Sequence, residues 1–554
     1  MEKIKKLLKS TGFKGELDDS LESLEFYSHD ASMFELRPKL IVKPQDSKDV
    51  EKLVSLVKAE KKNNPSLSLT ARSAGTCMSG GAINDSIIVD FLAHFNHIEK
   101  VTSSIAITQP GVLYKYFEKE TFKHNAIMPS FPASHDLASV GGMVANNSGG
   151  EKSFEYGKTE NYVKKLDFVF ADGIEREIVP LNKAQLDKKM SQKDFEGEVY
   201  KGIYKLVEDN YDVVKAAKPH VTKNSTGYNL WDVWDRQSGI FDLNKLIVGS
   251  QGTLGLVTNI EFELVKTRPH TGLLILFMRD IDNLGEVINK VIEAKPATFE
   301  AFDQATLFLA IKFMPMFLKL LGIKKFIHLV VSLIPDGFYI AEYRPKLVLM
   351  VEFNGQTEDE VRLKIKDLHS KLKKYKARYE INGFEETPTA GSSEKFWMIR
   401  RYSFQLLRSK VNNKHTAPFI DDFVVPPEHL SEFLPKLRAI IKKYNLFATI
   451  AGHMGDGNFH VIPLMQLEIK SDREKILPAM KEVNNLVLKY HGSLSGEHND
   501  GLVRGPWLEY MYGKEVLNIF KKAKSIMDPE EIFNPHKKAN ADWDYSFSHI
   551  REHF

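Results

Sequence analysis

The sequence predicts a multidomain protein of the α+β class. The chain has 554 residues, and one domain usually takes about 100–200. Hydrophobic residues make up 43% and charged residues 27%, which is ordinary for a globular protein that buries a large core. Short apolar runs bounded by glycines and other small residues, typical of strands, alternate with runs of helical spacing.

The composition excludes several classes of protein. The net charge is only +3, from 76 basic and 73 acidic residues, so we expect no nucleic-acid partner. The single cysteine, Cys77, excludes a disulfide framework and a cysteine-ligated iron–sulfur cluster. No apolar run follows the charged Met1–Lys6, and none is long enough to cross a membrane. We therefore expect a cytoplasmic protein.

The first third of the chain predicts strands that lead into loops of small residues. Residues up to about 35 are polar and predict a helix and a linker, followed by a strand at 40–44. An amphipathic helix begins at Ser47. An apolar strand then runs into the loop 72–82, and another strand follows at 87–90. Successive backbone N–H groups in such a loop form a concave anion site, although a single loop of this kind is more often only a turn.

Two further segments of small residues strengthen this interpretation. The segments 132–150 and 247–255 are rich in glycine, serine and alanine, and each lies next to a predicted strand. Two backbone-rich loops suit a pyrophosphate, which carries more charge than one loop neutralises. The first loop, 72–82, does not have the spacing of a Rossmann fingerprint or a P-loop.

A pair of histidines points to a metal site in the last quarter of the chain. Apolar residues flank His453 and His460, with Gly455 and Gly457 between them, which predicts strand, tight turn and strand. We expect the two imidazoles to face each other on adjacent strands. A carboxylate next to a further histidine, Glu497-His498, supplies a third ligand in a small-residue loop. Two histidines and one carboxylate suit a catalytic metal, although a histidine pair alone is more often structural.

In chain order, these segments resemble the vanillyl-alcohol-oxidase/PCMH superfamily of flavoenzymes. The branch is the one that contains D-lactate dehydrogenase, the glycolate oxidase flavin subunit and D-2-hydroxyglutarate dehydrogenase. The resemblance extends from about residue 27 to 537. It rests on the motifs at 71–76 with 79–81, 132–134, 141–146, 156–157 and 248–255.

The resemblance implies an architecture and a cofactor. After a helix and linker at 1–37, we expect a PCMH-type FAD-binding domain of two subdomains at 38–268. A ferredoxin-like α+β cap, or substrate, domain follows at 269–505, and a C-terminal helical segment at 506–554 packs back on the FAD-binding domain. FAD should be non-covalent, because nothing in the first loop matches the histidine of covalently flavinylated relatives.

The resemblance also assigns FAD contacts to the small-residue loops and to the C-terminal return. These residues are Arg72, Ser73, Ala74, Gly75, Thr76, Ser79, Gly80, Pro132, Ala133, Ser134, Ser139, Gly141, Gly142, Asn146, Tyr156, Gly157, Ile247, Val248 and Asn534. The sequence departs from the family pattern at Ser73 and Ala74, which replace glycines, at Gln251, which replaces glutamate, and at His536, which replaces glycine.

For catalysis, the resemblance implies a divalent metal, Zn or Mn, on His453, His460 and Glu497. His498 then acts as the general base on the substrate hydroxyl, while the Cα hydride passes to flavin N5. Arg400 binds the substrate carboxylate, as a guanidinium does bidentately, and Asn458 is a nearby polar contact.

The substrate implied is a D-2-hydroxy acid, with D-lactate as the type. Phe404 and Ile420 stand where hydroxyglutarate-type relatives have Thr and Lys, which favours a smaller or more apolar substrate. Glycolate and D-2-hydroxyglutarate are alternatives, as is a non-redox flavoenzyme similar to alkylglycerone-phosphate synthase. A metal-dependent hydrolase, with the loops binding a phosphorylated substrate, is the alternative from another class.

One segment does not fit the family pattern. Residues 304–335 contain no Asp or Glu, and apolar residues recur there at near-helical spacing among lysines. Such a segment either lies in the headgroup plane of a membrane, as a peripheral contact, or packs on the cap domain or a homodimer partner. Reduced FAD must pass electrons to a quinone, a carrier protein or oxygen, and a quinone would agree with membrane contact.

Overall fold

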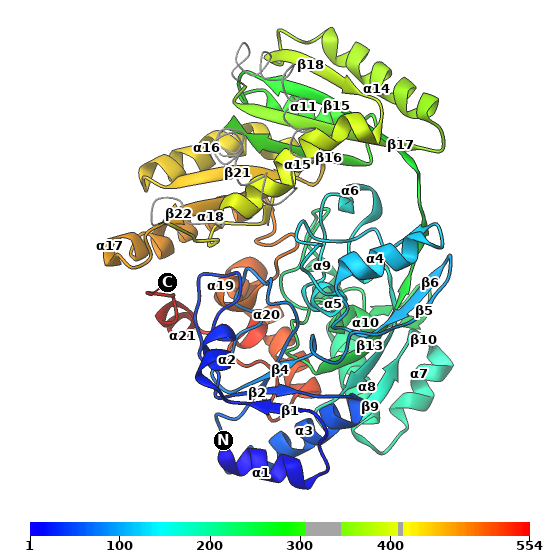
Figure 1. The fold of residues 1–554 in the computed structure, drawn as a ribbon, viewed down its shortest axis with the longest axis vertical. Coiled ribbons are helices and arrows are strands. Elements are labelled where there is room, and N and C mark those ends of the chain that lie inside the picture. Colours follow the sequence, from blue (N-terminus) through cyan, green and yellow to red (C-terminus); the bar gives the residue numbers. More distant parts are fainter. Residues whose placement is uncertain (305–344, 408–413, 554) are drawn as a thin grey trace.

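The computed structural model describes residues 1–304, 345–407 and 414–553, with the backbone alone over 402–407. The predicted insertion at 304–335 therefore lies outside the described residues except for Gln304, and so does the side chain of Phe404. A lower half built from the first 268 residues and the C-terminal segment carries an upper half built from the middle of the chain (Figure 1). Strands and helices are mixed in both halves, in agreement with the predicted class.

The N-terminal sheet has the strand order β1-β2-β4-β3. Its strands are β1 (Glu16–Asp18), β2 (Leu40–Lys43), β3 (Leu69–Arg72) and β4 (Ile87–Asp90), and its helices are α1 (Glu2–Ser10), α2 (Leu21–Phe26) and α3 (Ser47–Glu60). The apolar face of α3 is buried as its spacing predicts, and Asp46 caps its N-terminus. The segment predicted as a linker contains β1, which pairs with β2. The sequence did not predict this edge strand, because it has only three residues and two of them are charged.

The second subdomain is an antiparallel sheet with the order β5-β6-β13-β8-β9. Its strands are β5 (Ile98–Val101), β6 (Ile105–Thr108), β8 (Val163–Val169), β9 (Glu175–Ile178) and β13 (Leu256–Glu263). Its helices include α4 (Tyr114–Phe122), α5 (Val140–Asn146), α6 (Ser153–Tyr156), α7 (Lys183–Met190), α8 (Phe195–Asp209), α9 (Tyr211–Ala216) and α10 (Asn244–Ile247). A hydrophobic core between this sheet and these helices supports the second small-residue loop from below.

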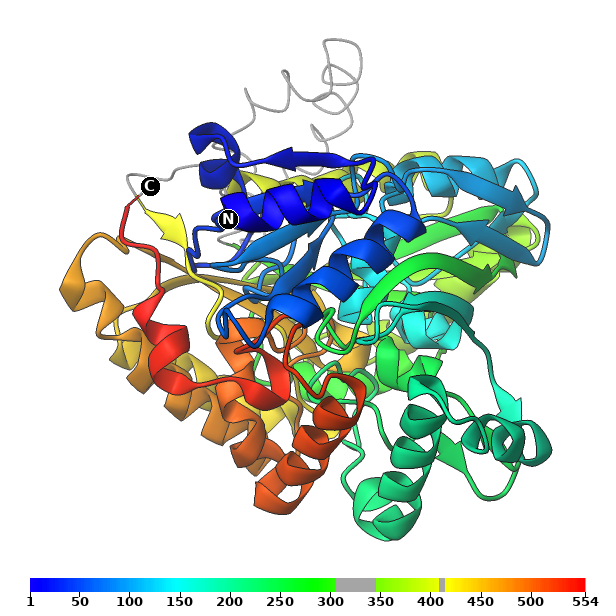
Figure 2. The same ribbon diagram turned by 90° about the horizontal axis from the view of Figure 1, so that it is seen from below.

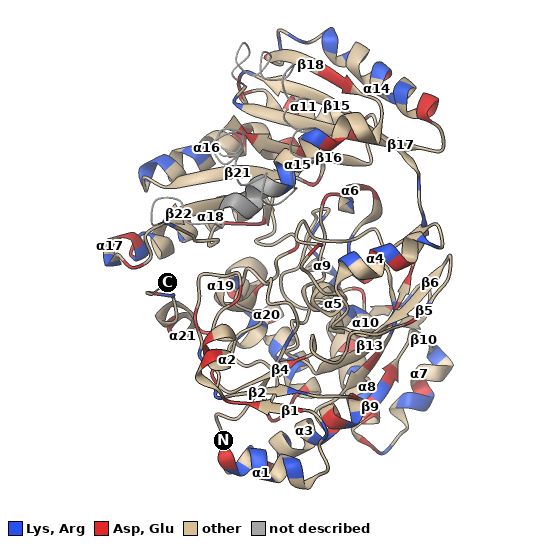
Figure 3. Ribbon diagram, in the orientation of Figure 1, with Lys and Arg blue, Asp and Glu red and all other residues tan. Residues whose placement is uncertain are grey.

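The upper half, the cap, is built on a sheet with the order β18-β15-β17-β16-β21-β22-β19 among the described residues, and β20 also pairs with β22. Its strands are β15 (His270–Met278), β16 (Thr298–Asp303), β17 (Leu347–Gly355), β18 (Ile381–Thr387), β19 (His415–Thr416), β20 (Phe423–Val424), β21 (Phe447–His453) and β22 (Asn458–Met465). Its main helices are α11 (Leu284–Ile292), α14 (Glu358–Lys373), α15 (Ala390–Leu407), α16 (Leu430–Lys443) and α18 (Ile476–Lys489). Outer helices such as α14 carry acidic and basic residues together (Figure 3).

The last part of the chain returns to the lower half. It contains α19 (Gly501–Arg504), α20 (Leu508–Met527) and α21 (Trp543–Ser548), and α20 packs against α8. Phe533 pairs with Leu69 at the edge of the N-terminal sheet, and Ile550 pairs with Phe34. The C-terminal segment therefore runs beside the N-terminal elements (Figure 2). None of the helices in the described ranges has the length and hydropathy needed to span a membrane.

Candidate active site

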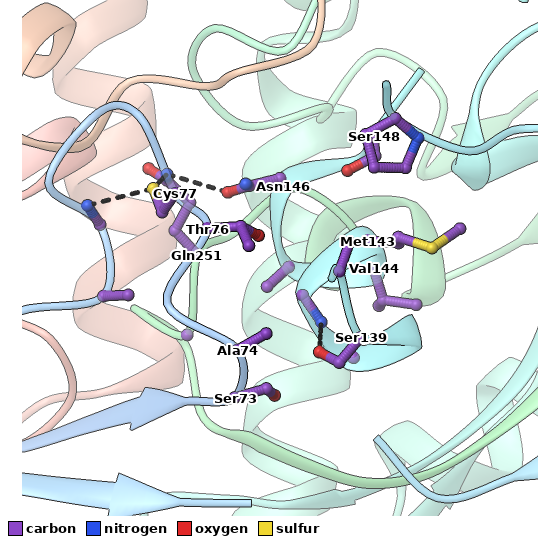
Figure 4. A pocket seen from close by; sticks show the side chains of 18 of the residues that line it. Ser73, Ala74, Thr76, Cys77, Ser139, Met143, Val144, Asn146, Ser148 and Gln251 are labelled. Atoms are coloured by element: carbon purple, nitrogen blue, oxygen red, sulfur yellow. Dashed lines mark hydrogen bonds between the residues drawn. The ribbon is translucent and has the colours of Figure 1, made fainter. Parts of the chain in front are cut away.

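A large cavity lies where the first small-residue loop faces α5 and the residues before it (Figure 4). Its empty volume is about 1420 Å³, including the part open to solvent, which leaves room for a dinucleotide. At one end the wall changes from small residues to Arg400, His460, Glu497 and His498 of the cap and the segment after it. The predicted cofactor loops and the predicted catalytic groups thus share one cavity.

The first loop is shaped around the buried side chain of Arg72. The Arg72 guanidinium donates hydrogen bonds to the carbonyl oxygens of Tyr27 and His29, at 3.3 and 2.9 Å. Gly75 has a φ of +67°, and a Cβ there would lie 2.5 Å from Arg72 Nη2. Glycine is therefore required at this position for both conformation and space. The small residues Ser73, Ala74, Gly75 and Thr76 of this loop line the cavity.

Gln251 joins the first loop to the second. Its Nε2 donates to Ser79 Oγ and to Asn146 Oδ1, both at 3.1 Å, and its Oε1 accepts from the Gly501 amide at 2.8 Å. A glutamate, usual in the family, could not donate to Asn146 Oδ1. The departure from the family pattern therefore has a structural role, because this amide connects both loops to the start of α19. Figure 4 shows its bond to Asn146.

Most of the predicted FAD contacts line the cavity. They are Arg72, Ser73, Ala74, Gly75, Thr76, Pro132, Ala133, Ser134, Ser139, Gly141, Gly142, Asn146 and Ile247. Ser79, Gly80, Tyr156, Gly157, Val248 and Asn534 do not line it. Asn534 lies behind the wall, where its Nδ2 donates to the carbonyls of Gly81 and Gln251 at 2.9 and 2.7 Å. Sequence reasoning missed the lining residue Pro110, which no motif marks, and it assigned no cofactor contact to Cys77 and Ser250, which lie in the predicted small-residue loops.

The histidine pair lies on the predicted strand–turn–strand, but in a different register. His453 pairs with Asn458 and His460 pairs with Ala451, so the two histidines are diagonal neighbours rather than directly opposite. The turn includes Gly457, whose φ is +64°. The ring centroids are 5.2 Å apart, so both imidazoles still reach one point.

The two imidazoles converge on one oxygen of the Glu497 carboxylate. His453 Nε2 lies 3.1 Å and His460 Nε2 lies 3.2 Å from Glu497 Oε1, and His498 Nε2 lies 4.0 Å from the same atom. Glu497 Oε2 is buried without a hydrogen-bond partner among the described residues. Two histidine nitrogens that point toward one carboxylate, one oxygen of which accepts no hydrogen bond from the described residues, are donors of the kind that bind a divalent ion.

Two buried carboxylates hold the outer nitrogens of these rings. Glu300 on β16 contacts His453 Nδ1, and Asp421 Oδ1 lies 3.1 Å from His460 Nδ1. Burial lowers the pKa of His460, but the hydrogen bond and charge of Asp421 with those of Glu497 outweigh it and raise the pKa to about 10. A divalent ion would have to displace these protons. Outer carboxylates on metal-binding histidines are a general feature of metal sites.

Lys223 of the lower half enters this cluster from the opposite side. It is 1% exposed, and its Nζ lies 3.1 Å from Asp456 Oδ2 and 3.6 Å from Glu497 Oε2. Although burial lowers the pKa of Lys223, the attraction of Asp456 and Glu497 raises it above its ordinary value. Burial raises the pKa of Glu497, but Lys223 and His453 hold it well below its usual range. Glu497 is therefore a carboxylate anion.

Asp422 fixes the loop that carries Glu497 and His498. Its carboxylate accepts from the backbone amides of both residues, at 3.0 and 2.7 Å from Oδ2, and from the hydroxyl of Ser495. Oδ1 also accepts from Asn458 Nδ2 at 3.1 Å. Asn458, the predicted polar contact, thus belongs to the hydrogen-bond network around Asp422, although its Oδ1 has no hydrogen-bond partner within the described ranges.

His498 and Arg400 both line the cavity. The His498 ring places Nδ1 2.7 Å from Asp421 Oδ2 and leaves Nε2 toward Glu497. Arg400 lies on α15 and its Nη2 is 3.1 Å from Glu300 Oε2. Glu300 therefore lies between the predicted carboxylate-binding guanidinium and His453.

A second group of donors, Asp422, His460, Glu497 and His498, also has atoms within 4.8 Å of one another. The Asp422 oxygens are already engaged by the loop amides. His453 Nε2 is nearer to Glu497 than is His498 Nε2. The predicted ligands His460 and Glu497 belong to this group, and the predicted ligand His453 does not.

A charged cluster joins the two halves beside Arg400. Arg401 donates to both oxygens of Glu151, in the second small-residue loop. Glu352 on β17 is 7% exposed near Lys152 and Glu151. Burial raises its pKa to about 7.

Comparison with protein-family models agrees with this geometry. Residues 38–178 match the model of an FAD binding domain, and residues 267–538 match the C-terminal domain of FAD linked oxidases. The chain belongs to the FAD-linked oxidases. The predicted resemblance, fold class and FAD-binding domain are thereby confirmed.

Several curated relatives of this FAD-linked oxidase are 2-hydroxy-acid dehydrogenases by name. D-2-hydroxyglutarate dehydrogenase of Pseudomonas putida is 26% identical over 534 residues, which are 96% of this chain and 51% of the relative. This chain thus spans about half the length of that protein. D-lactate dehydrogenase of Archaeoglobus fulgidus is 24% identical over 501 residues, 90% of each chain. Among solved structures, p-cresol methylhydroxylase shares the fold, with a TM-score of 0.65 at 12% identity over 98% of this chain and 95% of that one.

Proposed function

We propose that this FAD-linked oxidase oxidises a D-2-hydroxy acid to the 2-oxo acid. The observation that carries the proposal is that Arg400, His498 and Glu497 line the same cavity as the FAD loops. When bound, FAD supplies the two-electron acceptor, and a divalent ion supplies a positive charge that lowers the pKa of a hydroxyl beside it. His453, His460 and Glu497 would hold that ion.

Arg400 binds the substrate carboxylate. Arg400 lines the cavity, and its guanidinium has the planar set of N–H donors that binds a carboxylate. Arg400 is 5% exposed, and a charge-assisted hydrogen bond in such a place is stronger than one in water. The substrate is thereby oriented with its hydroxyl toward His498.

His498 takes the hydroxyl proton at Nε2. Its Nδ1 hydrogen is donated to Asp421, so the lone pair lies on Nε2, on the side of Glu497. The negative charge of Asp421 stabilises the imidazolium that forms. A base placed in this way typically contributes about 10²–10⁴ in rate.

We propose a small monocarboxylate such as D-lactate as the substrate. Glu300, Asp421, Asp422 and Glu497 surround the site with negative charge, which a second substrate carboxylate would meet at close range. Ile420, next to Asp421, is apolar and 2% exposed. The name of the Archaeoglobus relative agrees with D-lactate.

The test is to mix the FAD-loaded protein anaerobically with D- and L-lactate, glycolate and D-2-hydroxyglutarate and to follow the visible absorption band of the flavin. We expect D-lactate to bleach the band and L-lactate to leave it unchanged. Bleaching by D-2-hydroxyglutarate alone would contradict the substrate size, and no bleaching by any of them would refute the oxidation. Treatment with a chelator should abolish bleaching while FAD stays bound.

We propose a quinone or an electron-carrier protein as the acceptor, and peripheral membrane contact through residues 304–335, which lie outside the described residues except for Gln304. Reoxidation of the reduced protein by a short-chain quinone should be faster than by oxygen. Liposome flotation of the wild type and of a variant with Lys319, Lys324 and Lys325 changed to Glu tests the contact. Equal flotation of both would refute it.

A further inference from the structure

Asp421 has one imidazole on each oxygen of its carboxylate. Oδ1 lies 3.1 Å from His460 Nδ1, and Oδ2 lies 2.7 Å from His498 Nδ1. The two rings are stacked, with centroids 5.0 Å apart and planes 26° apart. Asp421 itself is 2% exposed. One buried side chain therefore contacts both a proposed metal ligand and the proposed base.

This arrangement sets the same tautomer in both rings. An ionised carboxylate only accepts hydrogen bonds, so each Nδ1 carries the hydrogen. Nε2 is therefore the nitrogen of each ring that faces Glu497, and the two Nε2 atoms lie 3.2 and 4.0 Å from Glu497 Oε1. In His460 an ion would displace the proton on Nε2 and bind there, and in His498 the substrate proton would go to Nε2.

The backbone around Asp421 is fixed independently of the two rings. Arg504, 2% exposed, donates to the Asp421 carbonyl and to the Asn499 carbonyl. Asp422, with a φ of +67°, binds the amides of the loop that carries His498. Both partners tie Asp421 to the segment 497–504, so the carboxylate and the His498 ring are held at a fixed separation.

We propose that Asp421 is a positioning residue that sets the metal-binding lone pair of His460 and the proton-accepting lone pair of His498 with a single carboxylate. The proposal rests on the proposed function, in which His460 binds the ion and His498 is the base. It adds that metal binding by His460 and proton transfer to His498 both depend on Asp421. A change at Asp421 should therefore impair both, and added metal should restore only the metal binding.

The test uses the FAD-loaded, full-length protein with Asp421→Asn. The amide keeps the shape but has only one accepting atom, so one ring must lose its bond or move its hydrogen to Nε2. We expect the affinity for Zn²⁺ or Mn²⁺, measured by titration calorimetry, to fall about 10–100-fold. At saturating metal and D-lactate, the rate of flavin reduction should still be at least about tenfold below that of the wild type.

Glu300→Gln is the matched control. Glu300 holds His453 as Asp421 holds His460, but its second oxygen contacts Arg400 rather than the base. We expect Glu300→Gln to weaken metal binding and raise the KM for D-lactate, and its reduction rate at saturating metal and substrate to stay well above that of Asp421→Asn. Full recovery of Asp421→Asn under the same conditions, or unchanged metal affinity, would overturn the proposal.

Asp421→Glu separates positioning from a merely structural role. It keeps two accepting oxygens one methylene further out, so its metal affinity and reduction rate should lie between those of Asn and the wild type. Equal values for Glu and Asn would overturn the proposal, and if the Asn variant loses FAD, the Glu variant is judged by its rate at saturating metal. A wild-type protein that binds metal but is not reduced by any 2-hydroxy acid would refute the proposed function, while the metal titrations would still test Asp421.

Discussion

Replacing Lys223 with Met should destabilise the protein, and bound metal should recover part of the loss. Lys223 Nζ lies 3.1 Å from Asp456 Oδ2 and 3.6 Å from Glu497 Oε2, and all three side chains are at most 4% exposed. Methionine fills a similar volume but removes the ammonium from both carboxylates, and Glu497 keeps only His453 and His460 beside it.

The magnitude follows from the burial. Removing one partner of a buried ion pair typically costs about 3–5 kcal/mol, because the remaining charge stays buried and uncompensated. A divalent ion on Glu497 replaces part of the missing charge, so the variant should bind the ion at least about tenfold more tightly than the wild type does. Each tenfold gain returns about 1.4 kcal/mol of stability at saturation.

The assay is urea unfolding of the wild type and the variant, with Zn²⁺ or with chelator, alongside calorimetric titration of the metal. Lys524→Met is the control, because Lys524 is 2% exposed and pairs with Asp528, away from the proposed metal ligands. Lys524→Met should lower the free energy of unfolding by a similar amount, and added metal should not restore it. Equal losses for Lys223→Met with and without metal, together with unchanged affinity, would refute the reasoning.

Three further predictions follow from single side chains. Burial raises the pKa of Glu352 to about 7. Between about pH 4.5 and 7 the unfolded chain therefore releases this proton while the folded state keeps it, and stability falls by about 3 kcal/mol as the pH rises. Glu352→Gln should gain that amount relative to the wild type between pH 4.5 and 8 in urea unfolding, and a constant difference would contradict the shift. Gly457→Ala should abolish metal binding in calorimetry, because its φ is +64° and a Cβ would lie 1.9 Å from the Val425 carbonyl oxygen; wild-type affinity would show that the turn is not required. Gln251→Ala removes the hydrogen bonds to Ser79 and Asn146 that connect the loops, so it should weaken FAD binding about tenfold or more, measured by flavin fluorescence. Unchanged binding would mean that these hydrogen bonds do not support the cofactor site.

The sequence predicted those parts of the site that depend on local pattern. The small-residue loops and the turn between His453 and His460 are marked by glycines whose conformations the structure requires. The register of that hairpin was predicted wrongly, because the turn closes after four residues, with Asn458 opposite His453, and this offsets the two histidines by two positions. The short charged strand β1 was missed because an edge strand of three residues has no apolar period.

The charged partners of the site could not be predicted in the same way. Glu300 contacts a histidine 153 positions later, and Lys223 pairs with residues more than 200 positions away. Pairing at such separations leaves no local spacing. Asp421 and Asp422 gave a weak signal, because two adjacent acids interrupt an otherwise apolar run from Phe419 to Val425. Their role follows only from the fold.

The pairing of Leu69 with Phe533 affects the order in which the chain can fold during synthesis. Leu69 lies on the edge strand β3, and its partner Phe533 is translated more than 460 residues later. The neighbouring Thr70 then donates a hydrogen bond to Asn534. Until the ribosome has made that segment, β3 exposes unpaired backbone groups that can join a neighbouring chain. The nascent lower half therefore keeps this strand edge open for longer than a contiguous domain of equal size would.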